Sequence, residues 1–255
     1  MSTHLPTMSR WKASGIHLAI SLTLALCVSA LLYLLWFPPP YFIAAGATGL
    51  MLLIVGVDIV VGPALTLLVF NPAKSKRQLR LDLSIIAIVQ TIAFAYGLFV
   101  ICQTRPVFVV AVVDRLRIVM ANELSDADLA KGHTPEFRHR SWTGPLLVGA
   151  KPGGADTLKL ALQALESGKD IDIRPQYYVS YSDAAESLMR HSRSLSQLKG
   201  LTPVQKGYLQ GLSDRAAKQG DTLRYIPLQS RKTDFAAILS TRTNRLVAVL
   251  ATDPW

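Results

Sequence analysis

The residue most out of keeping with its surroundings is Asp58, a carboxylic acid inside an apolar run that extends from residue 42 to residue 70. A charged group at the centre of a membrane helix costs roughly 2.5–3.5 kcal/mol, so such residues usually face a protein interior. Pro63 cannot donate its backbone hydrogen bond, and Thr66 is placed to satisfy the freed carbonyl. The spacing predicts a polar cluster within a membrane, formed by Asp58, Gly62, Pro63 and Thr66, with Gln90 and Thr91 from the next apolar run.

Three roles are open to Asp58. As a protonated group hydrogen-bonded to Gln90 or Thr91, it would hold the helices together, and on an outer face it would contact another membrane helix. It could also relay protons, although a single acid makes a short relay. Ala45 and Gly49 lie four residues apart in the same run and form a small-residue pair that permits close helix packing, which makes them candidate partner contacts.

The remaining polar residues predict no catalytic centre. His133 and His139 are six residues apart in a polar stretch, which is not the spacing of a metal site. No G-x-S-x-G, G-x-x-x-x-G-K-[ST] or G-x-G-x-x-G pattern supports a serine hydrolase or a nucleotide site. The net charge of +10 comes with interspersed acids and without aromatic–basic alternation, so it does not favour nucleic acid. We expect no catalytic residue, no metal, no cofactor and no nucleic-acid partner.

Three long apolar runs must position the polar cluster, at about residues 16–36, 42–70 and 83–102. A helix needs ~20 apolar residues to cross ~30 Å of hydrocarbon, and each run is that long. The first run could instead be a cleaved signal peptide, but it is longer than the usual ~7–15 residues and no A-x-A-like site follows. We therefore predict a transmembrane domain over residues 1–102, with three retained spans in the lipid bilayer.

Basic residues predict the orientation of these spans. Residues 1–102 carry six basic and two acidic residues, a net +4, and the basic ones flank the first run or lie in the loop 71–82. The positive-inside rule places the N-terminus and this loop in the cytoplasm. Three spans then leave residues 103–255 outside, in the periplasm if the membrane is a bacterial inner membrane.

Residues 103–255 have the pattern of a soluble α+β domain. Strands are expected at about 107–113, 117–120, 145–149 and 177–181. Helices are expected after the cap Ser125, at 156–167, at 184–192 and from Thr202 to about residue 218. The tail predicts a C-terminal antiparallel β-meander of strands 223–228, 234–240 and 245–250, with a turn at 241–244.

Several short motifs, in this order and spacing, resemble the TfpX/TfpZ family of type IV pilin accessory proteins over about residues 11–255. They are Asp58-x-x-x-Gly62-Pro63-x-x-Thr66, Asp82-Leu83, Gln90, Tyr96-Gly97, Arg105-Pro106-Val107, Val113-Asp114-Arg115, Trp142-Thr143-Gly144-Pro145, Arg174-Pro175-x-Tyr177-Tyr178 and Pro254-Trp255. An aromatic residue usually follows the Asp-Arg pair in that family, and here the position is Leu116. The resemblance implies an inner-membrane protein that helps its type IV major pilin, and other pilus assembly proteins of that membrane, to form pili. It brings no catalytic residue.

Aromatic residues of the soluble domain are the candidate contacts for such a partner. Trp142 is either a buried aromatic before a turn or a partner contact. Tyr177, Tyr178 and Tyr181 alternate between faces, so at least one is a candidate for exposure. Two other functions stay open at this point: a membrane-anchored transferase or protease acting at the periplasmic membrane edge, and a sensor or structural subunit of another envelope machine.

Overall fold

The computed structural model describes residues 9–39, 41–151, 170–231 and 233–255. The chain divides into two compact units. One, the helical unit, comprises the chain up to Leu34 together with Ala47–Cys102. The other, the sheet unit, comprises Leu35–Gly46 and Gln103–Trp255.

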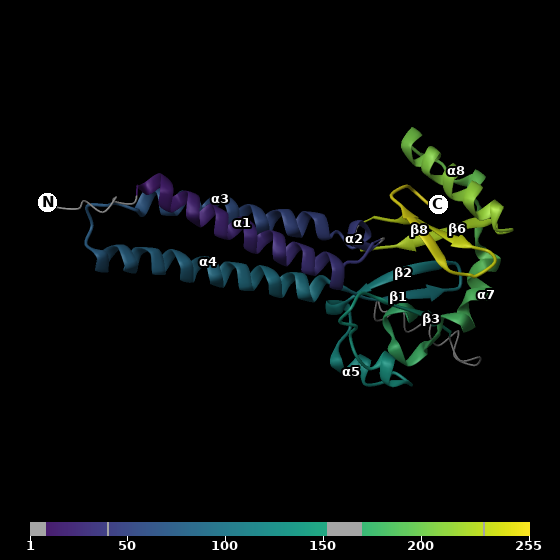
Figure 1. The fold of residues 1–255 in the computed structure, drawn as a ribbon. Coiled ribbons are helices and arrows are strands. Elements are labelled where there is room, and N and C mark those ends of the chain that lie inside the picture. Colours follow the sequence, from purple (N-terminus) through teal and green to yellow (C-terminus); the bar gives the residue numbers. More distant parts are fainter. Residues whose placement is uncertain (1–8, 40, 152–169, 232) are drawn as a thin grey trace. The chain divides into compact units, whose positions relative to one another are not determined.

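The helical unit contains three long helices that lie side by side (Figure 1). They are α1 (Arg10–Leu35), α3 (Ala47–Val69) and α4 (Lys76–Thr104). Within the described residues, these three helices are long and apolar enough to cross a membrane. Most of their large apolar side chains are exposed, as expected where the surrounding solvent is hydrocarbon rather than water. The three expected spans are therefore present as helices, with α1 and α4 extending into their basic flanks.

The second expected span, at 42–70, is interrupted near its start. A short helix α2 (Tyr41–Ala44) ends before Gly46, whose φ is +70°, and α3 begins only at Ala47. A positive φ is readily adopted by glycine and breaks a right-handed helix. Ala44 is buried in the core of the sheet unit, and its carbonyl accepts a hydrogen bond of 2.6 Å from Ser230 Oγ. The segment 35–46 thus differs from the expectation, because it packs with residues 103–255.

The sheet unit is built on a mixed sheet with the strand order β4-β3-β1-β2-β6-β7-β8, and β5 pairs with β6 at the side. β1 pairs with β2 antiparallel and with β3 parallel, and a two-residue parallel pairing of β2 with β6 joins the two halves. The strands are β1 (Pro106–Val112), β2 (Arg115–Met120), β3 (Leu146–Ala150), β4 (Tyr178–Ser180), β5 (Arg193–Ser194), β6 (Leu223–Gln229), β7 (Phe235–Ser240) and β8 (Leu246–Leu250).

The C-terminal meander is confirmed. β6, β7 and β8 pair antiparallel in sequence order, and the turn between β7 and β8 has Asn244 at φ +55°. Every residue of β1 is buried, which explains its unbroken apolar run. The parallel neighbours of β1 and β2 are not visible in the sequence, because pairing between distant strands leaves no local pattern.

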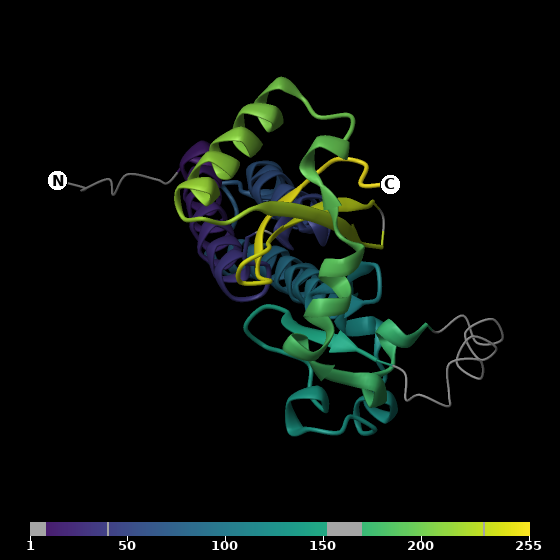
Figure 2. The ribbon, with the colours of Figure 1, turned by 90° about the vertical axis from the view of Figure 1, so that its right-hand side faces the viewer.

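Two helices cover parts of this sheet. α7 (Tyr181–His191) contacts β1 and β3, whereas Leu209, Leu212 and Ala216 of α8 (Pro203–Lys218) pack with strands β6–β8 (Figures 1 and 2). Thr202 caps α8 as expected, and Ser125 caps α5 (Asp126–Leu129). The helix expected at 156–167 lies outside the described residues. Short 3₁₀ turns complete the unit: η1 (Ala121–Glu123), η2 (Pro135–Phe137), η3 (Ile171–Ile173), η4 (Pro175–Tyr177) and η5 (Leu195–Gln197).

Candidate functional site

The polar residues expected on α3 share one buried face of that helix. A step of four residues turns by only about 40° past a full turn of an α-helix, which has 3.6 residues per turn, so Asp58, Gly62 and Thr66 follow one side of α3 within about 80°. Asp58 is 8% exposed and Thr66 is 2% exposed, and Gly62 and Pro63 are buried between them. The helical unit therefore brings together the α3 part of the predicted cluster.

Two residues of α1 complete the cluster. The Ser14 hydroxyl donates a hydrogen bond of 2.9 Å to the Pro63 carbonyl, and His17 Nδ1 lies 2.6 Å from Thr66 Oγ1. Thr66 thus pairs with His17 rather than with the carbonyl that Pro63 frees, which corrects the sequence expectation. The signal for Ser14 and His17 was present, since both are polar residues at the edge of the first apolar run.

Gln90 and Thr91 of α4 have different environments. The Gln90 amide lies against Gly62, so that a Cβ at residue 62 would stand 2.0 Å from Gln90 Nε2. Thr91 is exposed, and its hydroxyl donates to the Ala87 carbonyl of its own helix at 2.8 Å. The expectation that Thr91 reaches the cluster is wrong, because adjacent residues point about 100° apart on a helix and Gln90 occupies the inner side.

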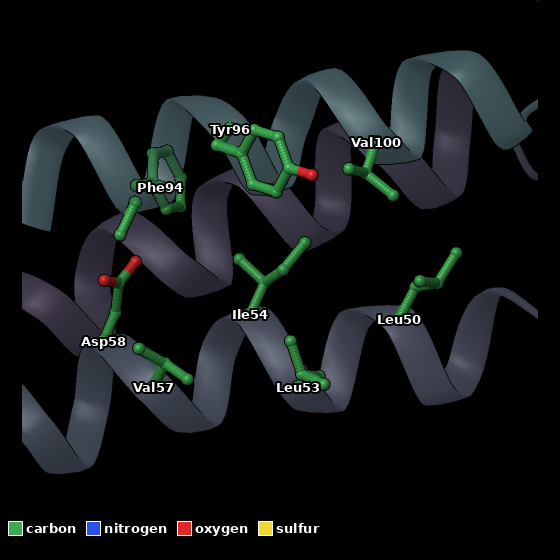
Figure 3. Close-up of a pocket in the computed structure, with 10 residues that line it drawn as sticks. Leu50, Leu53, Ile54, Val57, Asp58, Phe94, Tyr96 and Val100 are labelled. Atoms are coloured by element: carbon green, nitrogen blue, oxygen red, sulfur yellow. The ribbon is translucent and has the colours of Figure 1, made fainter.

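A groove of about 440 Å³ runs between α3 and α4 (Figure 3). Its walls are apolar apart from Asp58 at one end and the phenol of Tyr96. Gly97 lets the helices approach closely, since a Cβ there would stand 2.8 Å from Ile54 Cγ1. Figure 3 shows the Asp58 carboxyl group directed into the space between the two helices. The residues that line the groove are Leu50, Leu53, Ile54, Val57, Asp58, Ala93, Phe94, Tyr96, Gly97 and Val100.

The Asp58 carboxylate makes no hydrogen bond with any residue that the structure describes. His17 is near enough to interact with it electrostatically, Thr66 Oγ1 lies 2.6 Å from His17 Nδ1, and the Gln90 amide lies against Gly62. Of the two static roles that the sequence left open, the arrangement favours contact with another membrane helix over an internal bond between spans.

Ala45 and Gly49 do not form one helical face. Ala45 lies in the turn after α2 and packs at the edge of the sheet core, whereas Gly49 is exposed on α3. Gly46 separates them. The small-residue pair predicted from their spacing therefore fails, because the helix that the spacing assumed is broken there.

An aromatic stack joins the start of the sheet unit to β1. The Arg105 guanidinium lies 5.4 Å from the ring centre of Trp36 and 4.6 Å from that of Trp142. Gly144, at φ +85°, permits a close approach to Pro38, since a Cβ there would stand 2.9 Å from Pro38 Cγ. Trp142 itself is 65% exposed. Its alternative as a buried aromatic is therefore wrong, and its outer face is accessible.

The three candidate tyrosines differ in exposure. Tyr178 is 1% exposed, packs against Phe108 and Phe137, and donates its hydroxyl to the Asp172 carbonyl at 2.5 Å. Tyr181 is half-buried and donates to the Asn244 carbonyl. Tyr177 is also half-buried. Tyr178 thus has no surface for a partner.

Trp255 provides a second exposed aromatic surface, beyond the candidate contacts that the sequence indicates. Trp255 is 55% exposed and donates its indole N–H to Asp234 Oδ2 at 2.7 Å. It borders an open depression of about 640 Å³ on the sheet unit. The other residues lining this depression are Ile43, Thr233, Asp234, Phe235, Ala251, Thr252 and Asp253.

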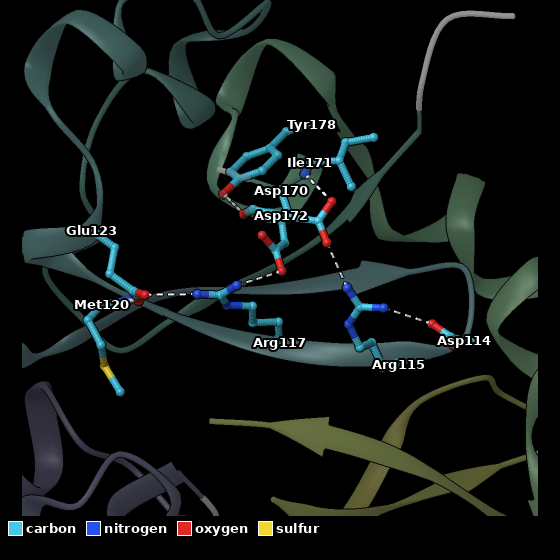
Figure 4. Close-up of polar contacts among 9 residues, drawn as sticks. All are labelled: Asp114, Arg115, Arg117, Met120, Glu123, Asp170, Ile171, Asp172 and Tyr178. Atoms are coloured by element: carbon cyan, nitrogen blue, oxygen red, sulfur yellow. Dashed lines mark hydrogen bonds and ion pairs between the residues drawn. The ribbon is translucent and has the colours of Figure 1, made fainter. Parts of the chain in front are cut away.

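Charged residues cluster at the strand β2 (Figure 4). Arg117 bridges Asp172, which is fully buried, and Glu123, at 3.0 Å and 2.9 Å. Burial raises the pKa of the Asp172 carboxyl, and Arg117 opposes this rise. Burial alone would lower the pKa of Arg117, but the charges of Asp172 and Glu123 outweigh it and raise that pKa. These ion pairs connect η3 and η1 to β2, so the cluster stabilises the fold of the sheet unit.

Among the described residues, no group of three His, Cys, Asp or Glu side chains is placed to hold a metal ion. The buried acidic side chains among the described residues are Asp58, in the groove between α3 and α4, and Asp172, which pairs with Arg117 (Figure 4).

The chain is similar to known proteins over nearly its whole length. It is 32% identical over 242 residues to a fimbrial assembly protein of serogroup I from Dichelobacter nodosus, and 31% identical over 241 residues to that of serogroup E1. Each alignment covers 93% of both chains. A family model described as fimbrial assembly protein FimB matches residues 6–46. No solved structure matches the chain.

Proposed function

This chain belongs to the family of fimbrial assembly proteins, and from that premise we propose that it promotes assembly of its cognate type IV pilin into pili by direct contact with the pilin. In this proposal it is a multi-pass protein of the bacterial inner membrane and has no catalytic activity. The resemblance to TfpX/TfpZ accessory proteins in the motifs around Asp58 and Trp142 supports the same role.

The proposed location rests on the three apolar helices and on their flanking charge. Lys76, Arg77 and Arg80 are exposed at the start of α4, and Lys74 pairs with Asp82 at 2.7 Å. Anionic lipid attracts such basic segments at the cytoplasmic surface. We propose a cytoplasmic N-terminus and a periplasmic sheet unit.

The observation that carries the proposed mechanism is the groove between α3 and α4, with Asp58 buried at its end and unbonded to the described residues. A type IV pilin awaiting assembly is held in the inner membrane by an apolar N-terminal helix, and its globular head lies in the periplasm. The helical unit offers this groove to the helix, and the sheet unit offers exposed Trp142 and Trp255 to the head. Binding at one level would make the other contact intramolecular, so two weak contacts suffice.

A strain that lacks this gene tests the proposal. The full chain should restore surface pili, whereas the chain without residues 103–255 should leave pilin in the membrane and unassembled. Exchange of residues 103–255 for those of a relative that serves another pilin should change which pilin is assembled. Normal piliation without the gene, or full piliation with residues 1–102 alone, would contradict the proposal.

A further inference from the structure

The groove between α3 and α4 has the shape expected of a seat for one helix. Its lining residues recur at intervals of three and four on both helices: Leu50, Leu53, Ile54, Val57 and Asp58 on α3, and Ala93, Phe94, Tyr96, Gly97 and Val100 on α4. From Leu50 to Asp58 the groove follows α3 for about 12 Å, at ~1.5 Å per residue. An apolar helix that lies in a groove is recognised through contacts at this same spacing.

The outer wall of the groove is open to the surroundings. Leu53 is 65% exposed and Tyr96 is 68% exposed, while Gly97 and Ile54 form the close contact beneath them. Side chains of an incoming helix would therefore meet Leu53, Val57 and Tyr96 before they meet the floor. Association of helices in a membrane relies on such packing, because apolar surface alone gives no preference for protein over lipid.

Asp58 determines the chemistry of the occupant. Its side chain is directed into the groove, it is 92% buried by the protein, and no described residue hydrogen-bonds to it. We propose that the groove binds an apolar membrane-spanning helix of a partner protein that carries a basic group or an N–H or O–H donor at the depth of Asp58. This inference rests on the proposed function, under which the occupant is the membrane helix of the pilin.

Lipid and a second copy of the chain fit the groove less well. An acyl chain would fill the apolar part but has no donor for the carboxylate. In a second copy, the exposed hydroxyls of Thr23 and Thr91 already donate to the carbonyls of Ala19 and Ala87 in their own helices, so these two groups offer no donor to Asp58. A partner helix with its own donor satisfies both the packing and the charge.

Site-specific photocrosslinking in native membranes tests the inference, with the epitope-tagged major pilin of the same bacterium as the probe. A photoreactive residue at Leu53, in the groove, should capture pilin. The same residue at Leu52 is the matched control, because Leu52 is 68% exposed on the same helix but does not line the groove. Capture at Leu52 should fall to the background seen without a photoreactive residue, because only the group at Leu53 lies within bonding reach of a helix in the groove.

Variants then test the shape of the groove and the Asp58 carboxyl group independently. Leu53→Trp fills the groove and should reduce pilus assembly at unchanged abundance, whereas Leu52→Trp should not. Asp58→Leu should abolish capture and assembly while the protein stays abundant, since no bond within the unit is lost, and Asp58→Asn should retain part of both. Loss of protein in Asp58→Leu would not obscure the outcome, because the comparison of Leu53→Trp with Leu52→Trp leaves Asp58 intact.

Four outcomes would overturn the inference: adducts with lipid only, adducts with a second copy only, equal capture from Leu52 and Leu53, or full assembly with Leu53→Trp. If assembly still depends on the gene in these cases, the proposed function stands and only the groove is wrong. If pili form normally without the gene, the proposed function itself is wrong.

Discussion

Gly62 on α3 lies beneath the side-chain amide of Gln90 on α4, so closely that residue 62 has no room for a Cβ atom. The amide thus occupies the space that any larger residue would need. We predict that Gly62→Leu lowers the amount of protein in the membrane, and that Gln90→Ala in the same chain restores part of it. Gly56→Leu is the control, because nothing lies within 4 Å of a Cβ at residue 56. Abundance in isolated membranes and thermal stability in detergent measure the effect.

The decisive observation for this prediction is whether Gln90→Ala raises the protein level of Gly62→Leu. If Gln90→Ala does not improve Gly62→Leu, the two residues do not share the space. If Gly56→Leu is as harmful as Gly62→Leu, the loss reflects leucine at any glycine of α3 rather than the contact with Gln90.

The second prediction concerns the buried charges at β2. Arg117→Met leaves Asp172 buried without its partner, and removal of one member of a buried pair costs about 3 kcal/mol or more. Arg190→Met is the matched control. Arg190 pairs with Glu186 at 3.1 Å on an exposed helix surface, where such a pair is worth about 0.5 kcal/mol. Thermal unfolding of the detergent-purified chain compares the two variants.

The pH dependence of this variant has a definite sign. Burial already raises the pKa of Asp172 in the folded protein, and Arg117 opposes that rise. Without Arg117 the pKa of the folded Asp172 carboxyl rises further above the unfolded value, so the variant gains stability relative to the parent as pH falls. If the loss of stability in Arg117→Met relative to the parent stays constant between pH 7 and pH 4, this account of Asp172 is wrong.

The elements that the sequence predicts are those with local signals. The caps Ser125 and Thr202, the continuous apolar run of β1 and the turn before Arg245 each have a short-range cause, and each lies where it was expected. The break at Gly46 was missed because the residues around it are as apolar as a span. Their burial against the sheet comes from residues more than 60 positions away in the chain.

The candidate site was predictable in part for a similar reason. Asp58 and Thr66 share a face through helical periodicity alone, so their side of the cluster follows from the sequence. Whether α1 or α4 supplies the partners depends on how each helix is rotated about its axis. Ser14 and His17 meet α3 and Thr91 does not, and apolar runs that are hydrophobic all round contain no signal of that rotation.

The third prediction concerns Asp221, which fastens the turn between β7 and β8. Its carboxylate accepts hydrogen bonds from the Ser240 hydroxyl and from the backbone N–H groups of Thr222 and Arg242. These bonds, that from Ser240 foremost, lower the pKa of Asp221. A lowered folded pKa contributes stability above the unfolded value of about 3.9, and this is lost as pH falls through the folded pKa.

Asp221→Ala should therefore unfold at a lower temperature than the parent at pH 7, and the difference should shrink below about pH 4. Asp214→Ala serves as the control, since Asp214 is exposed on α8 and no hydrogen bond to its side chain is found among the described residues. Unfolding midpoints at several pH values measure both. If the unfolding midpoint of Asp221→Ala differs from that of the parent by the same amount at pH 3 and pH 7, these hydrogen bonds do not depend on the negative charge of Asp221, and the prediction is wrong.

The last prediction is the orientation of the chain, and cysteine accessibility tests it without disturbing the fold. The two native cysteines, Cys27 and Cys102, are first replaced by serine. Ala73→Cys then probes the basic loop before α4, and Lys151→Cys probes the exposed position after β3. The positive-inside rule places Ala73 in the cytoplasm and Lys151 in the periplasm.

In intact cells with a permeable outer membrane, a membrane-impermeant maleimide should label only Lys151→Cys, and lysis should expose Ala73→Cys. Alkaline phosphatase fused at the same positions should be active at Lys151 and inactive at Ala73. Labelling of Ala73→Cys in intact cells would reverse the orientation, and with it the assignment of the sheet unit to the side of the membrane where pilin heads lie.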